Sequence, residues 1–298
     1  MINSHRFSHN ASISHYGNWE GSHLIKLNSI QATIDISFYN QRLTILEYNS
    51  FSSQGISELS QFLSRISIKL GLNKIWGKIP SCDSEKFVEY GFTSEASIGS
   101  YFLNDDAIIC SKFFNNRNIS KTPHINKEII QAISSAPPKN NTDLKDGYHY
   151  KLADPIELRA LSRLFNRVFT TYPYPVFNEN YLYSTLDHTI YGLIYNKQKH
   201  IAAVASAETD QLHKNAEMTD FATLPQERGQ GLASIILHNL ESYLKSRNYR
   251  CVYSIARSTS FSMNAVFKSA GYSYTGTLIN NCNIAGGLED MNVWYKLL

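Results

Sequence analysis

The sequence predicts an α/β protein in which a mixed sheet is built twice, once in each half of the chain. Two observations lead to this prediction. Strand-like runs alternate with helix-like runs along most of the 298 residues, which is the pattern of folds that pack helices on sheets. Both halves also run helix, strand, short helix, Gly-aromatic pair and strand, with Gly91-Phe92 in the first half matching Gly271-Tyr272 in the second. Such self-similarity indicates a duplicated unit, and chance likeness between two α/β segments is the alternative.

Composition sets the broad class. A hydrophobic content of 43% is enough for proper cores, and 28 basic against 25 acidic residues give a net charge of +3. This charge is too mild for a nucleic-acid binder. No apolar run is long enough to span a membrane, and the first residues lack the apolar core of a signal peptide, so we expect a cytoplasmic protein. No metal site is expected, because the cysteines are widely spaced at Cys82, Cys110, Cys251 and Cys282.

The first predicted domain comprises residues 1–118. Its pattern predicts a strand at 43–48, a helix at 57–70, a strand at 74–79 and a short helix at 84–90. Because it lacks the glycine turn of the second half, we expect it to serve as scaffold, as the surface of a homodimer, or as a lid on the substrate site.

Residues 119–146 are expected to link the two halves. They contain the run Ala136-Pro137-Pro138-Lys139-Asn140-Asn141, and their apolar periodicity amounts to one short helical turn around Ile129 and Ile133.

The second predicted domain, residues 147–298, opens with a strand at 148–152. Asp154-Pro155 is a helix start, and apolar residues at helical spacing extend that helix to Val168. A short helix follows Asn178. Further strands are expected at 190–195, 201–209, 216–223, 251–256, 274–279 and 291–297, with helices at 232–247 and 263–270.

A glycine-rich turn, Arg228-Gly229-Gln230-Gly231-Leu232-Ala233, stands at the start of a helix. Glycines and a helix N-terminus together form a phosphate cradle. A nucleotide-hydrolysing loop needs Lys-Ser or Lys-Thr at the positions that Leu232 and Ala233 occupy here. A dinucleotide site needs an acidic residue near the end of the next strand, but residues 254–257 of that strand include none. The pyrophosphate of coenzyme A remains, and an ordinary helix start is the alternative.

The order of strand, Pro225, glycine turn, helix, strand, short helix and Gly-Tyr resembles the GNAT superfamily of acetyl-CoA-dependent N-acetyltransferases. The coenzyme motif of that superfamily is met by Arg228, Gly231 and Ala233. The resemblance implies a GNAT fold for the second half, preceded by a degenerate GNAT-like first half. It also implies acetyl-CoA as co-substrate, held by Phe221, Ala222, Thr223, Arg228, Gly229, Gln230, Gly231, Leu232, Ala233, Asn264 and Phe267.

Within that superfamily, the chain resembles the β-lysine N6-acetyltransferases over most of its length, most strongly from about residue 172 onward. This implies transfer of acetyl to the N6 amine of β-lysine (3,6-diaminohexanoate), a small diamine, to make the osmolyte N6-acetyl-β-lysine. The alternatives are another small amine or a lysine side chain as acceptor, or a non-catalytic module that binds acetyl-CoA. The segments that carry this likeness are 217–223, 253–257, 263–264, 280–281 and 291–296, with 78–80, 90–92 and 95–98 in the first half.

The reaction needs a base, because the acceptor amine is protonated at neutral pH. Glu217 is the preferred candidate and Asp220 the next, since both lie on the strand that leads to the cradle. Strand alternation puts 217 and 220 on opposite faces unless a bulge intervenes. Either acid is as well explained as a solvent-facing or salt-bridged residue. GNAT enzymes often have a tyrosine proton donor where this chain has Phe267, so that role falls to Tyr272, Tyr253 or solvent, or is not needed.

Candidates for substrate recognition lie near the C-terminus and after the first helix of the second half. A guanidinium matches a carboxylate, while amide and acidic side chains suit ammonium groups. An aromatic wall stiffened by proline is expected around Tyr172 and Tyr174. Each candidate also has a purely structural explanation: Arg257 as a surface arginine, the asparagines as ordinary turn residues, and the Tyr172–Tyr174 segment as a rigid end of a helix. The full set is Tyr172, Tyr174, Arg257, Asn280, Asn281, Asn283 and Glu289.

Overall fold

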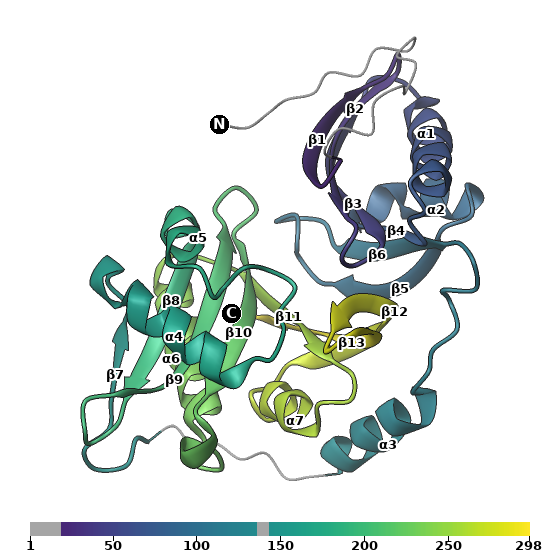
Figure 1. Ribbon diagram of the computed structural model, residues 1–298. Coiled ribbons are helices and arrows are strands. Elements are labelled where there is room, and N and C mark those ends of the chain that lie inside the picture. Colours follow the sequence, from purple (N-terminus) through teal and green to yellow (C-terminus); the bar gives the residue numbers. More distant parts are fainter. Residues whose placement is uncertain (1–18, 136–142) are drawn as a thin grey trace.

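Two mixed sheets form the framework of the protein (Figure 1). The computed structural model describes residues 19–135 and 143–298. In the first half, six strands are ordered β1-β2-β3-β4-β6-β5. The elements of this half are β1 (Gly21–Lys26), β2 (Ile30–Ser37), β3 (Arg42–Ser50), α1 (Gly55–Lys69), β4 (Lys74–Pro80), α2 (Ser81–Glu89), β5 (Thr93–Ile98) and β6 (Ala107–Phe113).

The second half contains seven strands ordered β12-β13-β11-β10-β9-β8-β7. Asp154 and Glu157 form the capping box that begins the α4 region, as the Asp-Pro signal predicts. The elements are β7 (His149–Leu152), η1 (Pro155–Glu157), α4 (Leu158–Val168), α5 (Glu179–Ser184), β8 (Thr189–Tyr195), β9 (Ile201–Asp210), β10 (Asn215–Thr223), η2 (Pro225–Glu227), α6 (Leu232–Ser246), β11 (Cys251–Arg257), α7 (Phe261–Ser269), β12 (Ser273–Ile284) and β13 (Gly287–Leu297).

The predicted duplication is confirmed by topology. Reading the first sheet as β5-β6-β4-β3-β2-β1 reproduces the order β12-β13-β11-β10-β9-β8 of the second. The one parallel pair is β3 with β4 in the first sheet and β10 with β11 in the second. Each half also ends its short helix on a left-handed glycine, Gly91 or Gly271, beside an aromatic pair, Phe87 with Phe92 or Phe267 with Tyr272.

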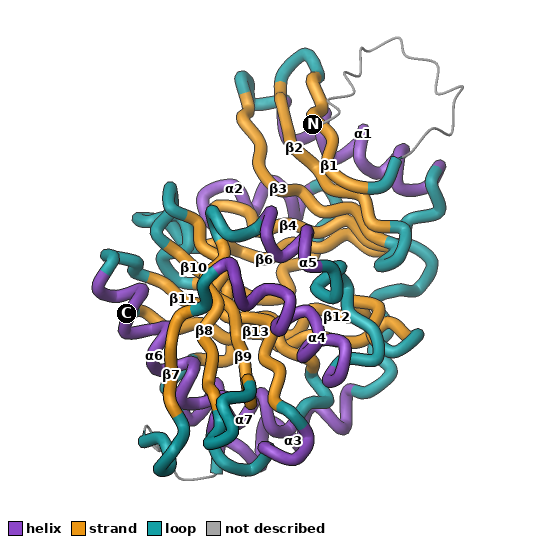
Figure 2. Tube along the Cα trace, turned by 60° about the vertical axis from the view of Figure 1, so that its left-hand side comes forward, coloured by secondary structure: helices purple, strands orange, loops and turns teal. Residues whose placement is uncertain are grey.

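The faces of the second sheet are covered differently. Helices α6 and α7 pack on one face, where Ile236, Leu240 and Phe267 are buried. Helices α4 and α5 lie across β8, β9 and β10 on the opposite face, as Figures 1 and 2 both show. That second face is therefore shared between the α4–α5 layer and the first half of the chain.

The two halves share a core of their own. Strand β5 packs against β12 and β13, and residues of β4 to β6 join residues of β11 to β13 in one buried cluster. The backbones approach closely at Gly276, where an added Cβ would lie 2.0 Å from the carbonyl oxygen of Glu95. Thr275 Oγ1 also donates to the carbonyl of Ser97 across this contact, at 2.6 Å. The first half is thus fixed to the second.

The segment predicted as a linker is more ordered than expected. It contains a 12-residue helix, α3 (Pro123–Ser134), in place of one short turn, and Pro123 stands in the first turn, where proline is tolerated. Helix α3 packs against α7, and Ile133 is buried in the core of the second half. The proline-rich run at 136–141 lies outside the described residues. In the described chain, no helix is long and apolar enough to cross a membrane.

Candidate functional site

The glycine turn is a cradle in the structure. Gly229 and Gly231 have φ values of 78° and 76°, in the left-handed region that favours glycine. Gly231 is the N-cap of α6, so the first N–H groups of that helix point out of the turn without intrahelical acceptors. A Cβ added at Gly229 would meet nothing within 4 Å. The space over the turn is therefore open, and the cradle fits an anionic group.

The cradle is held in place from behind by a buried acid. Glu227 accepts hydrogen bonds from Asn196 Nδ2 at 2.9 Å, Tyr148 Oη at 2.7 Å and Gln230 Nε2 at 2.8 Å. These donors, Asn196 first, lower the pKa of Glu227. Gln230 therefore supports the loop, and Arg228 turns its Nε towards the carbonyl of Thr223 at 3.3 Å.

Strands β10 and β11 separate before they reach the cradle. They run parallel and pair only from Asn215 to Glu217 with Cys251 to Tyr253, although β10 continues to Thr223 and β11 to Arg257. After Glu217, the edge of β10 that faces β11 forms no strand pairing with the described residues of β11. Polar backbone groups on such an edge require a partner, so the gap is suited to an extended ligand.

A bulge in β10 brings the two predicted acids to one face. The register of β10 against β9 shifts between Thr219 and Ala222, and Asp220 has a left-handed φ of 54°. Asp220 accepts from Ser206 Oγ at 2.8 Å, and Ser206 stands opposite Thr219 on the face that also carries Glu217. The strict alternation expected from the sequence is broken, because a bulge inserts one residue and reverses the pattern after it.

A third carboxylate, which the sequence reasoning missed, lies opposite Glu217. Glu208 on β9 pairs in register with Glu217 on β10, so the two side chains stand side by side on one face. Desolvation of the carboxyl, and then the negative charges of Glu217 and Asp220, raise the pKa of Glu208 to about 8. The Glu208 side chain keeps access to solvent. An exposed carboxylate with a raised pKa is suited to accept a proton near neutral pH.

Asp220 is held differently from Glu208. It is only 6% exposed, and its two oxygens accept from Tyr172 Oη at 2.6 Å and from Ser206 Oγ at 2.8 Å. Burial raises the pKa of Asp220 although both hydroxyls oppose the shift. Both oxygens being engaged, Asp220 is placed to orient Tyr172 and the bulge more than to accept a proton.

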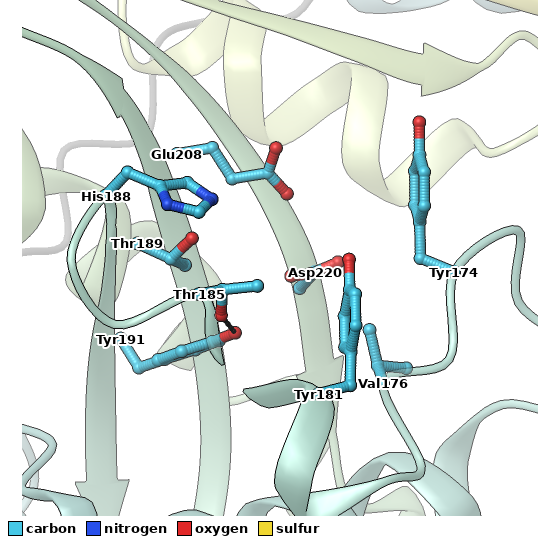
Figure 3. A pocket seen from close by; sticks show the side chains of 9 residues that line it. All are labelled: Tyr174, Val176, Tyr181, Thr185, His188, Thr189, Tyr191, Glu208 and Asp220. Carbon is cyan, nitrogen blue, oxygen red and sulfur yellow. Dashed lines mark hydrogen bonds between the residues drawn. The ribbon is translucent and has the colours of Figure 1, made fainter. Parts of the chain in front are cut away.

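The carboxylates and aromatic rings enclose a small cavity (Figure 3). It holds about 300 Å³ of empty space, its open mouth included. Glu208 and Asp220 rise from neighbouring strands, and in this view Tyr181 stands between Tyr191 on one side and Tyr174 on the other. Val176, Thr185, His188 and Thr189 complete the lining. The aromatic wall predicted around Tyr172 and Tyr174 is thus adjacent to the acids.

The first half of the chain also reaches this site. Lys78 on β4 places its Nζ 3.9 Å from Glu217 Oε2 and donates to Tyr253 Oη at 2.8 Å. Sequence reasoning did not select Lys78, because nothing in a single strand indicates which other strand it will face.

Asn264 and Phe267, expected to contact the coenzyme, are buried in the core. Asn264 Nδ2 donates to the carbonyls of Arg257 and Ser260, and its Oδ1 accepts from Asn292 and Trp294. All four hydrogen bonds of this amide are made within the protein, so the structure gives Asn264 the role of fixing α7 to β13. Phe267 is 1% exposed and packs edge-on against Phe221.

The predicted arginine and glutamate of the substrate site neutralise each other. Arg257 Nε and Nη2 donate to the two oxygens of Glu289 at 2.7 and 2.5 Å. Arg257 is the last residue of β11. Carboxylate recognition by Arg257 would require this pair to open, and no described contact favours that.

The asparagines of β12 face the first half of the chain instead of the cavity. Asn280 Nδ2 donates to the carbonyls of Arg117 and Ile119 at 2.8 Å, and Asn283 Nδ2 donates to the carbonyl of Tyr39 at 3.1 Å. Asn281 is 1% exposed. These side chains were expected in a loop, but they lie in a strand that the first half covers. That contact engages the Nδ2 atoms of Asn280 and Asn283, whereas the buried Oδ1 atoms of Asn280, Asn281 and Asn283 have no hydrogen-bond partner among the described residues.

Comparisons with known proteins agree with this geometry. Residues 157–272 match the model of the acetyltransferase (GNAT) family. The chain is 34% identical to a β-lysine N(6)-acetyltransferase of Methanococcus maripaludis, over 92% of this chain and 98% of that protein. It is 32% identical to the N-acetyltransferase YodP of Bacillus subtilis over the same shares. It is 37% identical to a β-lysine N(6)-acetyltransferase of Methanosarcina mazei, over 54% of this chain and 59% of that protein. The chain therefore belongs to the GNAT family and is an acetyl-CoA-dependent N-acetyltransferase.

Proposed function

We propose that this protein acetylates the N6 amine of β-lysine, with acetyl-CoA as the donor. The observation that carries this proposal is the cluster Glu208, Glu217 and Asp220 beside the point where β10 and β11 separate. Acidic and aromatic side chains around a small cavity suit an ammonium substrate. Two relatives, 34% and 37% identical, are named for this reaction.

The cradle is suited to the pyrophosphate of coenzyme A. The left-handed glycines Gly229 and Gly231 expose N–H groups at the positive end of α6, where an anion is stabilised. Phe221, Ala222 and Thr223 follow the bulge on the unpaired edge of β10, which leads from the carboxylates to the cradle. When bound, acetyl-CoA supplies a thioester whose carbonyl carbon accepts the amine.

The proton of the amine is proposed to pass to the Glu208–Glu217 pair. At pH 7.4 an amine with a reference pKa near 10.4 is about 0.1% neutral, so forming the nucleophile costs on the order of 4 kcal/mol. The sequence favours Glu217 as the base, and Glu208 stands directly opposite it. Two facing carboxylates titrate as a pair, and the raised pKa of about 8 belongs to the side chain that lines the cavity.

Stabilisation of the reacting carbonyl and of the leaving thiolate falls to other groups. Backbone N–H groups of β10 after Asp220 lie on the unpaired edge and can donate to a developing oxyanion. Phe267 cannot donate a proton, and Tyr272 is buried in the core facing Phe267 and Glu241. Tyr253, which faces Glu217 across the parallel pair, is therefore the proposed proton donor to the thiolate.

A small amine fits the site better than a peptide lysine. The cavity is enclosed by α5, the Tyr174 segment and the sheet, whereas a peptide needs an open groove for its backbone on either side of the reacting lysine. A non-catalytic module is disfavoured by the presence of an exposed carboxylate with a raised pKa at the reacting centre.

The test is an acetylation assay on the purified protein. β-Lysine, lysine, spermidine, 1,4-diaminobutane and a lysine peptide are each incubated with acetyl-CoA, and free thiol and product mass are followed. We expect kcat/KM to be highest for β-lysine, with a single acetyl group on N6. Equal turnover of all amines would contradict the substrate assignment, and coenzyme binding without thiol release would contradict the enzyme.

A further inference from the structure

Within the described part of the first half, Lys78 is the side chain that forms an ion pair with the carboxylate cluster. Its Nζ lies 3.9 Å from Glu217 Oε2 and 2.8 Å from Tyr253 Oη. Three aromatic rings surround the ammonium, with centroids 4.7 Å away for Tyr253, 5.4 Å for Tyr101 and 6.0 Å for Trp76. The lysine and Glu217 side chains keep 21% and 22% exposure, so both stay within reach of a substrate.

Three carboxylates lie close together near Lys78, and a positive charge at this point stabilises them. Glu208, Glu217 and Asp220 crowd one face of β9 and β10, and in the described chain Lys78 is the basic side chain within ion-pair distance of them. Burial opposes the charge of Lys78, but Tyr101, Glu217 and Glu208 outweigh it, so its pKa is raised. His188, which lines the cavity, pairs with Asp187, and His213, which stacks on Tyr101, pairs with Asp210.

The contact between the halves holds Lys78 in register. Lys74, on the same strand, donates to Glu95 at 2.8 Å and to the carbonyl of Ile279 at 3.0 Å across the interface. Arg117 donates to the carbonyl of Asn280 at 2.7 Å from the same side. Because these bonds are buried and charged, β4 has little freedom to slide over the second sheet.

We propose that Lys78 is a positioning residue of the acetyltransferase reaction, and that the first half of the chain thereby completes the active site. Its ammonium pairs with the Glu217 carboxylate and orients the hydroxyl of Tyr253 at the point where β10 and β11 separate. The phenol oxygen accepts from Lys78 and the phenol hydroxyl is hydrogen-bonded to Glu217, so the three side chains form one network at this point. This inference rests on the proposed function of the same site.

The test compares Lys78→Met, Lys78→Arg and the control Lys86→Met in the full chain. Lys86 lies on α2 of the same half, where it pairs with Asp83 on the surface. Removing the cation raises the pKa of the carboxylate pair, so we expect the acid limb of the kcat/KM profile to move up by about one pH unit in Lys78→Met. Lys78→Arg is expected to restore the limb, Lys86→Met to match the wild type, and calorimetry to show unchanged CoA affinity.

A second readout does not depend on turnover. Without Lys78 the ionised pair is less well compensated, so the Tm of Lys78→Met is expected to fall further below that of the wild type as the pH rises from 6 to 9. The kinetic test uses whichever amine the wild type accepts, so a wrong substrate assignment leaves it intact. An unchanged profile, or a Tm difference independent of pH, would overturn the role of Lys78.

Discussion

Single residues decide the pH dependence of this enzyme, because two carboxylates face each other across β9 and β10. We expect Glu208→Gln to remove the limb of kcat/KM that rises towards pH 8 and to lower the rate at pH 8 by about 100-fold, the scale of a lost general base. The check is a pH–rate profile beside Glu89→Gln, a surface control on α2. A profile identical to the wild type would remove Glu208 from the reaction.

The same substitution has a stability signature with a defined sign. The pKa of Glu208 is raised on folding, so its ionisation destabilises the folded state above the ordinary pKa of a glutamate, and the loss grows as the pH rises towards 8. Glu208→Gln removes that loss, so its Tm should exceed that of the wild type at pH 8 and match it near pH 4.

How far single residues can be predicted from sequence depends on whether their partners are local. Glu208 could have been found, because a four-residue turn at 211–214 joins β9 to β10 and fixes Glu208 opposite Glu217. Asn280 and Asn283 could not be interpreted in this way. Their partners, the carbonyls of Arg117 and Tyr39, lie more than 160 residues away and in the other half.

At the scale of elements, the cradle was predicted and the bulge was not. The glycine turn before α6 is readable because left-handed backbone restricts the residue type, and Gly229 and Gly231 both adopt it. The bulge places Asp220 at φ 54°. Aspartate tolerates this left-handed conformation but also occurs in ordinary strand conformations, so its presence in the sequence does not predict a bulge. Strict alternation therefore predicts the correct face of the sheet for residues 215–219 of β10, and the opposite face for the residues after the bulge.

The cradle can be tested by adding one methyl group. Gly231→Ala places a Cβ on a left-handed residue at the mouth of α6, which costs about 1 kcal/mol of strain and crowds the anion. Gly71→Ala is the matched control, since Gly71 has φ 69° and lies far from the cradle at the end of α1. Both variants should lose similar stability in urea, and only Gly231→Ala should bind CoA more weakly. Equal CoA affinity for the two would contradict the cradle.

At the scale of the whole molecule, the chain is a duplicated sheet in which the second copy carries the glycine cradle and the described residues of the first do not. The helix that corresponds to α6 is α1, whose N-cap Gln54 has an ordinary φ of −89°. Its first turn carries Glu58, whose carboxylate accepts from the N–H groups of Asn28 and Ser29. Glu58 thus places a negative charge beside this helix start, which disfavours an anion there.

The packing of the first half on β11 to β13 makes the activity depend on a contact remote from the cradle. In Gly276→Ala the new Cβ would lie 2.0 Å from the carbonyl oxygen of Glu95, so β5 and β12 must move apart. Overpacking of this kind costs about 1–3 kcal/mol. Because β4 moves with β5, Lys78 is drawn away from Glu217 and kcat/KM should fall, while CoA affinity stays at the wild-type value.

The matched control for this contact is Gly287→Ala. Its added Cβ meets nothing within 4 Å, although Gly287 lies in β13 of the same hairpin. Urea unfolding, kcat/KM and CoA calorimetry on both variants separate the two sites. If Gly276→Ala lost stability yet kept its kcat/KM, the first half would be a scaffold only. The joint loss of stability and turnover at constant CoA affinity is what an active site completed by both halves requires.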